Sequence, residues 1–215
     1  ADVRERPLEQ HQKMNHFPGI GILITKVTMN DNNRDSKYIL PFFELPYDDD
    51  LLQEYLINNP HKELLEKNVY NRGVKIIDVK DINGIEDSDL FYQEFMSNHF
   101  LIDGHAFDFG VFVLITSFDP VRIYRYEEIL LRFCPKKYHP FDRDDTGKYV
   151  VQEGCLSPYE MTTFKELYGK HGYTIKSIFE YHIKQKGFSV GDFWARIDDA
   201  IVSIILNSEE FIVEK

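Results

Sequence analysis

One carboxylate in this chain stands where a turn meets a long apolar segment. Asp108 follows the turn Asp103–His105 and precedes the run Val111–Ile115. A continuously apolar run predicts a strand that is covered on both faces. An aspartate at the start of such a strand is either a turn cap or an active-site group, and the residue type alone favours the cap.

The cations that could act on an anionic ligand fall in two places. Lys67 ends a predicted strand just before a loop, from which an ammonium group could reach phosphates, although a single lysine is more often plain surface. A second group lies close together in the sequence and forms either a local basic patch or, as such clusters usually do, a solvated strand edge and loop: Arg122, Arg125, Arg132, Lys136 and Lys137.

Composition narrows the classes of function. The net charge of -11 over 215 residues argues against nucleic-acid binding and is an awkward match for an acidic substrate. Cys134 and Cys155 form neither a disulfide framework nor a zinc pattern, and the eight histidines show no paired-ligand spacing, so no metal site is expected. No apolar run approaches the roughly 20 residues of a membrane helix. We therefore expect a reduced compartment and no membrane segment in this chain.

The elements that must position these residues are short strands followed by helices. The C-terminal part predicts helices over Thr174–Lys186 and from Ser189 onward, the second with a regular apolar stripe best explained by core packing. We expect the polar segment Asn30–Ser36 to be an exposed loop, and residues 48–58 to form a helix that begins with three acids. Lys136–Gly154 reads as a long charged loop. The predicted strands are Ile20–Val27, Tyr38–Leu45, Glu63–Lys67, Val74–Val79, Leu90–Met96, the run at Val111 and Val121–Tyr126. Such a mixture predicts an α+β fold.

Several blocks of the sequence, in order, resemble the tubulin–tyrosine-ligase-like family. They read QKMNHFPG (12–19), KYILPFFELP (37–46), EKNVYNRGVKI (66–76), FYQEFM (91–96), the segment around Asp108 and VRIYRYEEILLRF (121–133). Several ordered blocks are more specific than a single motif. The resemblance is to a divergent, polyglutamylase-like member.

What the resemblance implies for the fold is an ATP-grasp-like arrangement, in which two β-sheet lobes clasp a nucleotide and helices follow. Residues 1–215 would then form one partial ligase domain, with a first lobe over about 1–98 and a second over about 99–215. The family's last catalytic segment, which carries the metal ligands, would lie outside this chain.

The implied activity is an ATP-dependent ligation of an amino acid. Glutamate, or another amino acid, would be added to a protein carboxylate through an acyl phosphate, with tubulin or another acidic protein as the substrate. ATP and Mg²⁺ are the implied cofactors. A monomer that acts in the cytoplasm at the cytoskeleton is expected.

The resemblance also assigns roles to particular residues. Asp108 and Arg122 would be catalytic, and Arg132 is a weaker match on the substrate side. Gln93 would read the adenine edge from a strand edge. The nucleotide site as a whole would comprise Lys67, Arg72, Gly73, Gln93, Glu94, Phe95 and Met96.

Two departures from the family pattern favour a second interpretation. The lysine that the family carries two residues before Asp108 is Ala106 here, and the arginine two residues after it is Gly110. Losing one such electrostatic contact typically costs on the order of 100–1000-fold in rate. The alternative is therefore a catalytically inactive pseudo-ligase that serves as a nucleotide- or protein-binding module.

Overall fold

The computed structural model of the chain describes residues 9, 11, 17, 19–68, 73–78, 82, 90–151, 154–170 and 172–213. Helices and antiparallel strands are mixed along the chain, which confirms the predicted α+β class. The strands are β1 (Phe42–Glu44), β2 (Leu64–Asn68), β3 (Val74–Ile77), β4 (Leu90–Glu94), β5 (Phe107–Phe118) and β6 (Val121–Phe133). The α-helices are α1 (Gly21–Ile24), α2 (Lys26–Asp31), α3 (Asp49–Asn58), α4 (Thr162–Leu167), α5 (Ile175–Gln185), α6 (Val190–Asn207) and α7 (Glu209–Val213).

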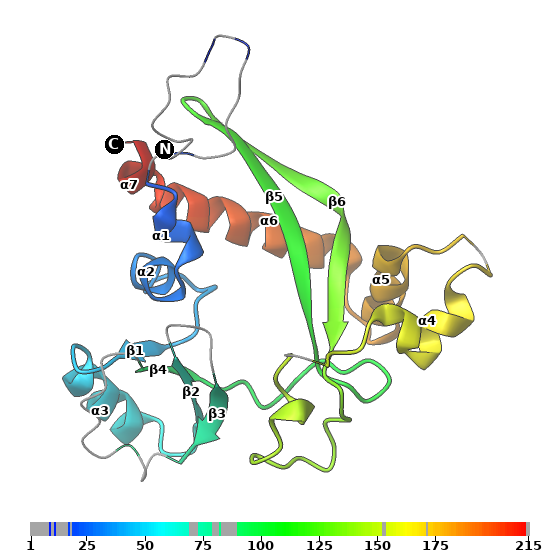
Figure 1. The fold of residues 1–215 in the computed structure, drawn as a ribbon, viewed down its shortest axis with the longest axis horizontal. Coiled ribbons are helices and arrows are strands. Elements are labelled where there is room, and N and C mark those ends of the chain that lie inside the picture. Colours follow the sequence, from blue (N-terminus) through cyan, green and yellow to red (C-terminus); the bar gives the residue numbers. More distant parts are fainter. Residues whose placement is uncertain are drawn as a thin grey trace.

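A four-stranded sheet and helix α3 form one part of the molecule (Figure 1). The strand order is β1-β4-β2-β3, and every neighbouring pair is antiparallel. Leu52 and Leu56 of α3 are buried in one cluster with Leu64 and Tyr92 of the sheet. The predicted helix over residues 48–58 is confirmed, with Asp49 and Asp50 in its first turn, where the helix dipole favours negative charge.

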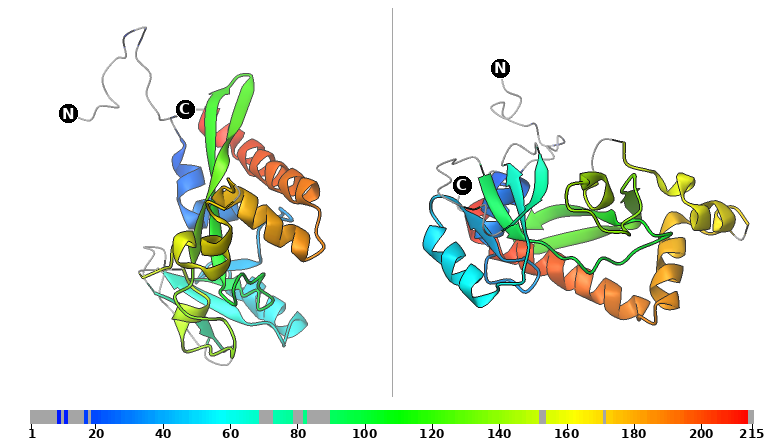
Figure 2. Two further views of the ribbon diagram at one scale, coloured as in Figure 1. Left: turned by 90° about the vertical axis from the view of Figure 1, so that its right-hand side faces the viewer. Right: turned by 90° about the horizontal axis from the view of Figure 1, so that it is seen from below.

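A long antiparallel ribbon, β5–β6, forms the centre of the other part. Its strands are joined by the predicted turn at Asp119-Pro120, and β6 runs seven residues beyond the predicted end at Tyr126, to Phe133. Helices α5 and α6 cover one face of the ribbon (Figure 2).

The opposite face of the ribbon carries exposed apolar side chains. Phe112 is 57% and Leu114 53% exposed. The prediction that the run Val111–Ile115 is covered on both faces is therefore wrong, because no second layer from the described residues packs on this face. Apolar composition predicted the strand but not the number of layers around it.

Residues 20–27, predicted as a strand, form helices α1 and α2. Their β-branched residues favour a strand locally, but Ile20 and Leu23, three residues apart, pack on the same cluster as Ile205 and Ile212. Tertiary packing overrides the local preference here.

The predicted exposed loop 30–36 is also partly wrong, since Asn30 belongs to α2 and Asn33 is only 1% exposed. The Asn33 amide donates to the Met29 carbonyl at 2.8 Å and accepts a hydrogen bond from Asn207 at 3.0 Å. These bonds explain why a polar residue is buried at this point.

Contacts cross the predicted lobe boundary near residue 98. The ring of Phe17 packs edge-on against Phe118 at the tip of the ribbon, with centroids 5.0 Å apart. Gly19 has a φ of +78°, and a Cβ added there would lie 2.4 Å from the carbonyl oxygen of Phe211. The first helices thus lie beside α6 and α7 (Figure 1), and the division at residue 98 stays a prediction.

The C-terminal helices follow the sequence signals closely. The side chains of Thr174 and Ser189 accept hydrogen bonds from the backbone N–H groups of Ser177 and Asp192, and Gly187 takes φ +82° after α5. Both predicted helices are confirmed. No helix among the described residues has both the length and the hydrophobicity needed to cross a membrane.

Candidate functional site

The four-stranded sheet brings Lys67 and Gln93 together. Lys67 is paired with Phe91 across β2 and β4, and Gln93 lies two residues further along β4, so both side chains emerge on one face. The Lys67 ammonium donates to the Gln93 Oε1 oxygen at 2.6 Å. The two residues that the resemblance assigns to a nucleotide are thus direct neighbours.

The Lys67 ammonium sits in an environment that disfavours its charge. Burial and, to a smaller extent, the positive charge of Lys26 together lower the pKa of Lys67 to about 8. A bound anion would compensate both effects. The lysine is therefore chemically suited to a phosphate or carboxylate.

Lys26 is the residue that sequence reasoning missed. It is the first residue of α2, is exposed, and is close enough to Lys67 to affect its ionisation. Predicting a helix over residues 20–31 would have placed Lys26 on that helix. The neighbouring sequence, however, does not indicate that Lys26 lies near Lys67 of β2. This electrostatic effect depends on where α2 is placed relative to the sheet.

The backbone groups that follow Gln93 are largely hydrogen-bonded to other parts of the protein. The N–H groups of Glu94 and Phe95 donate to the carbonyls of Pro41 and Glu63 at 2.9 and 2.8 Å. Strand β4 lies between β1 and β2, so the expectation that Gln93 sits at a strand edge is wrong. Phe95 is buried, whereas Met96 is 55% exposed.

The Glu94 side chain also has partners. It accepts a hydrogen bond from the Tyr55 hydroxyl at 2.5 Å and forms an ion pair with Lys62. Its carboxylate therefore helps to hold α3 and the start of β2 against β4.

Gly73 precedes β3 with φ +74°, and a Cβ added to it would meet no atom within 4 Å. The glycine is thus required by its backbone conformation and stands in open space. Arg72, the other half of the predicted pair, lies outside the described residues.

Asp108 is engaged in a cross-strand ion pair. Its two carboxylate oxygens accept from the Nε and NH2 groups of Arg132, directly opposite on β6, at 3.0 and 2.6 Å. The side chains are 43% and 49% exposed. Asp108 is not a turn cap but the second residue of β5.

Arg122 is far from Asp108. It pairs with Ser117 beside the Asp119-Pro120 turn, ten residues along β6 from Arg132. At about 3.4 Å per residue the two ends are roughly 30 Å apart. The structure does not bring the two predicted catalytic residues together.

The remaining members of the basic cluster are largely balanced by acids. Arg125 pairs with Asp198 at 2.6 Å, and Lys136 pairs with Asp145 at 2.9 Å. Together with the Asp108–Arg132 pair, these contacts favour the solvated-surface interpretation over a basic patch.

The two positions that depart from the family pattern differ in their surroundings. Ala106 is 1% exposed and packs in an apolar cluster with Phe95 and Cys134. Gly110 lies within β5, and a Cβ added there would make an ordinary 3.5 Å contact with Leu130. A Cβ is accommodated at Gly110, whereas a larger side chain at Ala106 would have to be buried among apolar residues.

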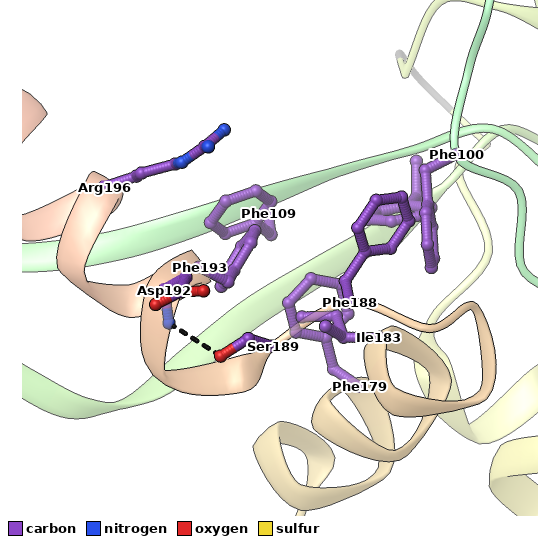
Figure 3. A pocket seen from close by; sticks show the side chains of 10 residues that line it. Phe100, Phe109, Phe179, Ile183, Phe188, Ser189, Asp192, Phe193 and Arg196 are labelled. Carbon is purple, nitrogen blue, oxygen red and sulfur yellow. Dashed lines mark hydrogen bonds between the residues drawn. The ribbon is translucent and has the colours of Figure 1, made fainter.

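A separate apolar pocket of about 440 Å³ lies on the helix-covered face of β5 (Figure 3). Rings from β5, α5 and α6 line it, including Phe107, Phe109, Phe179 and Phe193. Side chains alternate along a strand, so Phe107 and Phe109 point to the opposite face from Asp108. The pocket is thus separated from the Asp108–Arg132 pair by the ribbon.

No three His, Cys, Asp or Glu side chains of the described residues come together as a metal site. Both cysteines are free, and burial raises the pKa of the Cys134 thiol to about 11. A thiol with so high a pKa is a poor nucleophile at neutral pH.

The protein is thus an α+β chain whose antiparallel sheet presents a lysine–amide pair suited to an anionic ligand. It belongs to the tubulin-tyrosine ligase family, because the model of that family matches residues 2–214.

Individual relatives point the same way. The chain is 31% identical over 192 residues to the probable tubulin polyglutamylase ttll-15 of Caenorhabditis elegans, which covers 89% of this chain and 37% of that protein. It is 26% identical to the tubulin monoglutamylase TTLL4 of Mus musculus (96% and 19% covered). It is 28% identical to the mouse tubulin polyglutamylase TTLL6 (97% and 27% covered). The chain therefore spans 37% or less of the length of these relatives.

Proposed function

We propose that this chain is the nucleotide-binding part of an ATP-dependent ligase that adds glutamate, or another amino acid, to carboxylates of tubulin tails or of another acidic protein. Family membership supports the class of reaction, since the relatives are named as tubulin polyglutamylases and monoglutamylases. The observation that carries the proposal is the Lys67–Gln93 hydrogen bond, within electrostatic reach of Lys26.

These residues fit the polyanionic and aromatic parts of ATP. Lys67 and Lys26 would hold phosphate oxygens, and the Gln93 amide would meet a polar edge of the base or ribose. When bound, ATP supplies the phosphoryl group that activates a carboxylate for attack by an amine through an acyl phosphate. Mg²⁺ would accompany the nucleotide, with its ligands outside the described residues. The half-buried position of Lys67 strengthens its attraction for an anion, because screening by water is weaker there.

A pseudo-ligase is the second candidate, and specific observations favour it. Ala106 and Gly110 remove two cations, and the remaining guanidinium of Arg132 is bound to Asp108. The same lobe that binds a nucleotide would then serve for sensing or for binding a partner protein.

The test is ATP binding measured by calorimetry with Mg²⁺, comparing the wild-type protein with Lys67→Ala. We expect affinity to fall about 10–100-fold in the variant, as for the loss of a charged hydrogen bond. Lys37→Ala is the matched control, since Lys37 pairs with Asp199 and is 74% exposed. Equal affinity in Lys67→Ala and wild type would contradict the assignment, and glutamate ligation to tubulin peptides then separates the ligase from the pseudo-ligase.

A further inference from the structure

A second concave site lies between β6 and the segment that leads from α4 to α5. Its volume is about 560 Å³. Besides two isoleucines, a threonine and two glycines, its lining consists of three tyrosines and one carboxylate: Tyr159, Tyr168, Tyr173 and Glu128. These four residues are called the tyrosine pocket below. The pocket is separate from Lys67 and Gln93, which do not line it.

The three tyrosine rings line this pocket. Tyr159 and Tyr168 have centroids 5.1 Å apart and planes at 83°, so the two rings meet edge to face. Tyr168 and Tyr173 form a β-bridge, and Gly169 and Gly172 both have positive φ. The bridge places two of the three tyrosines on neighbouring backbone positions.

The rings are accessible to a ligand. The exposed fractions are 52% for Tyr159, 46% for Tyr168 and 36% for Tyr173. The face of an aromatic ring carries partial negative charge and attracts cations, and several rings around one space add their effects.

Glu128 adds a formal negative charge to the same space. It is half-buried on β6, next to the buried Ile129, and its carboxylate has no hydrogen-bond or ion-pair partner among the described residues. No lysine or arginine belongs to the lining, so the pocket is not filled by a described cation of this chain. The neighbouring Lys170 is exposed and lies outside the lining.

We propose that the tyrosine pocket binds an alkylammonium group, in particular the methylated ammonium of a lysine side chain from a partner protein. Methylation keeps the positive charge while weakening its hydration, which suits an aromatic wall better than a free ammonium. The net charge of -11 also favours the approach of a cationic segment.

The experiment is an NMR titration of the whole chain, following the ring signals of its tyrosines. The probes are a short peptide with trimethyllysine, the same peptide with unmodified lysine, choline, and 3,3-dimethylbutanol, which is a neutral analogue of choline. We expect saturable shifts at Tyr159, Tyr168 and Tyr173 with trimethyllysine and choline, and at least tenfold weaker binding of the neutral analogue. If the trimethyllysine peptide binds more tightly than choline, the ligand of the pocket is a segment of a partner protein. If the two bind equally, the ligand is a small amine, and the assignment to a partner protein is wrong.

Matched variants separate cation binding from general apolar contact. Glu128→Gln and Tyr168→Leu should each weaken binding about tenfold, whereas Tyr168→Phe, which keeps the ring, should retain most of it. Tyr47→Leu is a control at a tyrosine that is 81% exposed and outside the pocket. Unchanged thermal midpoints would show that the variants fold. Equal binding of choline and its neutral analogue, or no effect of Glu128→Gln, would overturn the proposal.

Discussion

The candidate cation of the four-stranded sheet, Lys67, and that of the β5–β6 ribbon, Arg132, have opposite surroundings. In the sheet, Lys67 is half-buried, bonded to a neutral amide and close to a second cation. In the ribbon, Arg132 is exposed and already bound by the carboxylate of Asp108. Among the described residues, Lys67 thus has no acid as its ion-pair partner, whereas Arg132 belongs to a neutralised pair.

This difference bears on how the family pattern has changed in this chain. The positions that match the resemblance in the sheet keep an arrangement suited to an anion, whereas the ribbon has Ala106 and Gly110 in place of cations. A ligand that needs both parts would be held mainly by the sheet.

Restoring the missing lysine at Ala106 should destabilise the protein strongly. Ala106 is 1% exposed among apolar residues, so Ala106→Lys would bury an uncompensated charge and lower the free energy of unfolding by about 3–5 kcal/mol. Urea unfolding measures this. Gly110→Lys is the control, because that position has room beside Leu130, and it should change stability by less than about 1 kcal/mol. Similar losses in both variants would show that the two positions do not differ as described.

ATP affinity should depend on pH through Lys67. The protonated form binds phosphate, and its pKa in the free protein is about 8, so affinity is full below pH 8 and falls as pH rises through that value. The protonated fraction drops roughly fivefold between pH 8 and pH 9. Calorimetry across pH 7–9 should show this fall in the wild type, and a flat profile in Lys67→Arg, whose guanidinium stays charged. A profile that is equally steep in both proteins would assign the titration to another group.

Acid should destabilise the part of the molecule around the ribbon before the four-stranded sheet. Burial lowers the pKa of His182 on α5, whose ring packs against Phe164, whereas His61, beside the sheet, is exposed. A histidine with a lowered pKa in the folded state binds protons more readily when unfolded, so its stabilising effect is lost as pH falls below 6.5. Hydrogen exchange measured at pH 7 and at pH 5 should show that the protection of backbone amides decreases more in α5 than in β2 and β4.

The corresponding variants identify the groups. His182→Phe should reduce this acid sensitivity, because a phenyl ring can replace the contact with Phe164 without titrating. Protection lost equally in both parts of the molecule would contradict the prediction.

Breaking the Asp108–Arg132 pair should change stability least. Both side chains are nearly half exposed, so Asp108→Asn and Arg132→Gln should each alter the free energy of unfolding by less than about 1 kcal/mol. A double-mutant cycle in urea measures the coupling. If Asp108 nevertheless acts in ligation, Asp108→Asn would lower the rate while leaving the thermal midpoint in place, which separates a chemical role from a structural one.

Local sequence signals predicted the parts of the fold that depend on neighbouring residues. The ends of α5 and the start of α6 could be read from Thr174, Gly187 and Ser189, because caps act within one helical turn. Helices α1 and α2 could not, since their conformation depends on packing against residues near position 205. The β-branched residues of that segment favour a strand when only neighbouring residues are considered, and the distant contacts reverse this preference.

The candidate site shows the same division. Lys67 and Gln93 were identified through their sequence blocks, and strand register then explains their contact. Lys26 was missed because its approach to Lys67 depends on the placement of a helix that was itself predicted wrongly. The Asp108–Arg132 pair is set by the register of residues 24 positions apart, which the sequence does not specify.

The packing of Phe17 and Ile20 against Phe118, Ile205 and Ile212 has a consequence for how this protein is made. Contacts between such distant residues form late, because a long stretch of chain must first be ordered. During synthesis the apolar side chains of the first helices would stay exposed until nearly two hundred more residues had been added and the residues that cover them were present. A nascent chain of this kind is a natural client for chaperones that bind exposed apolar segments.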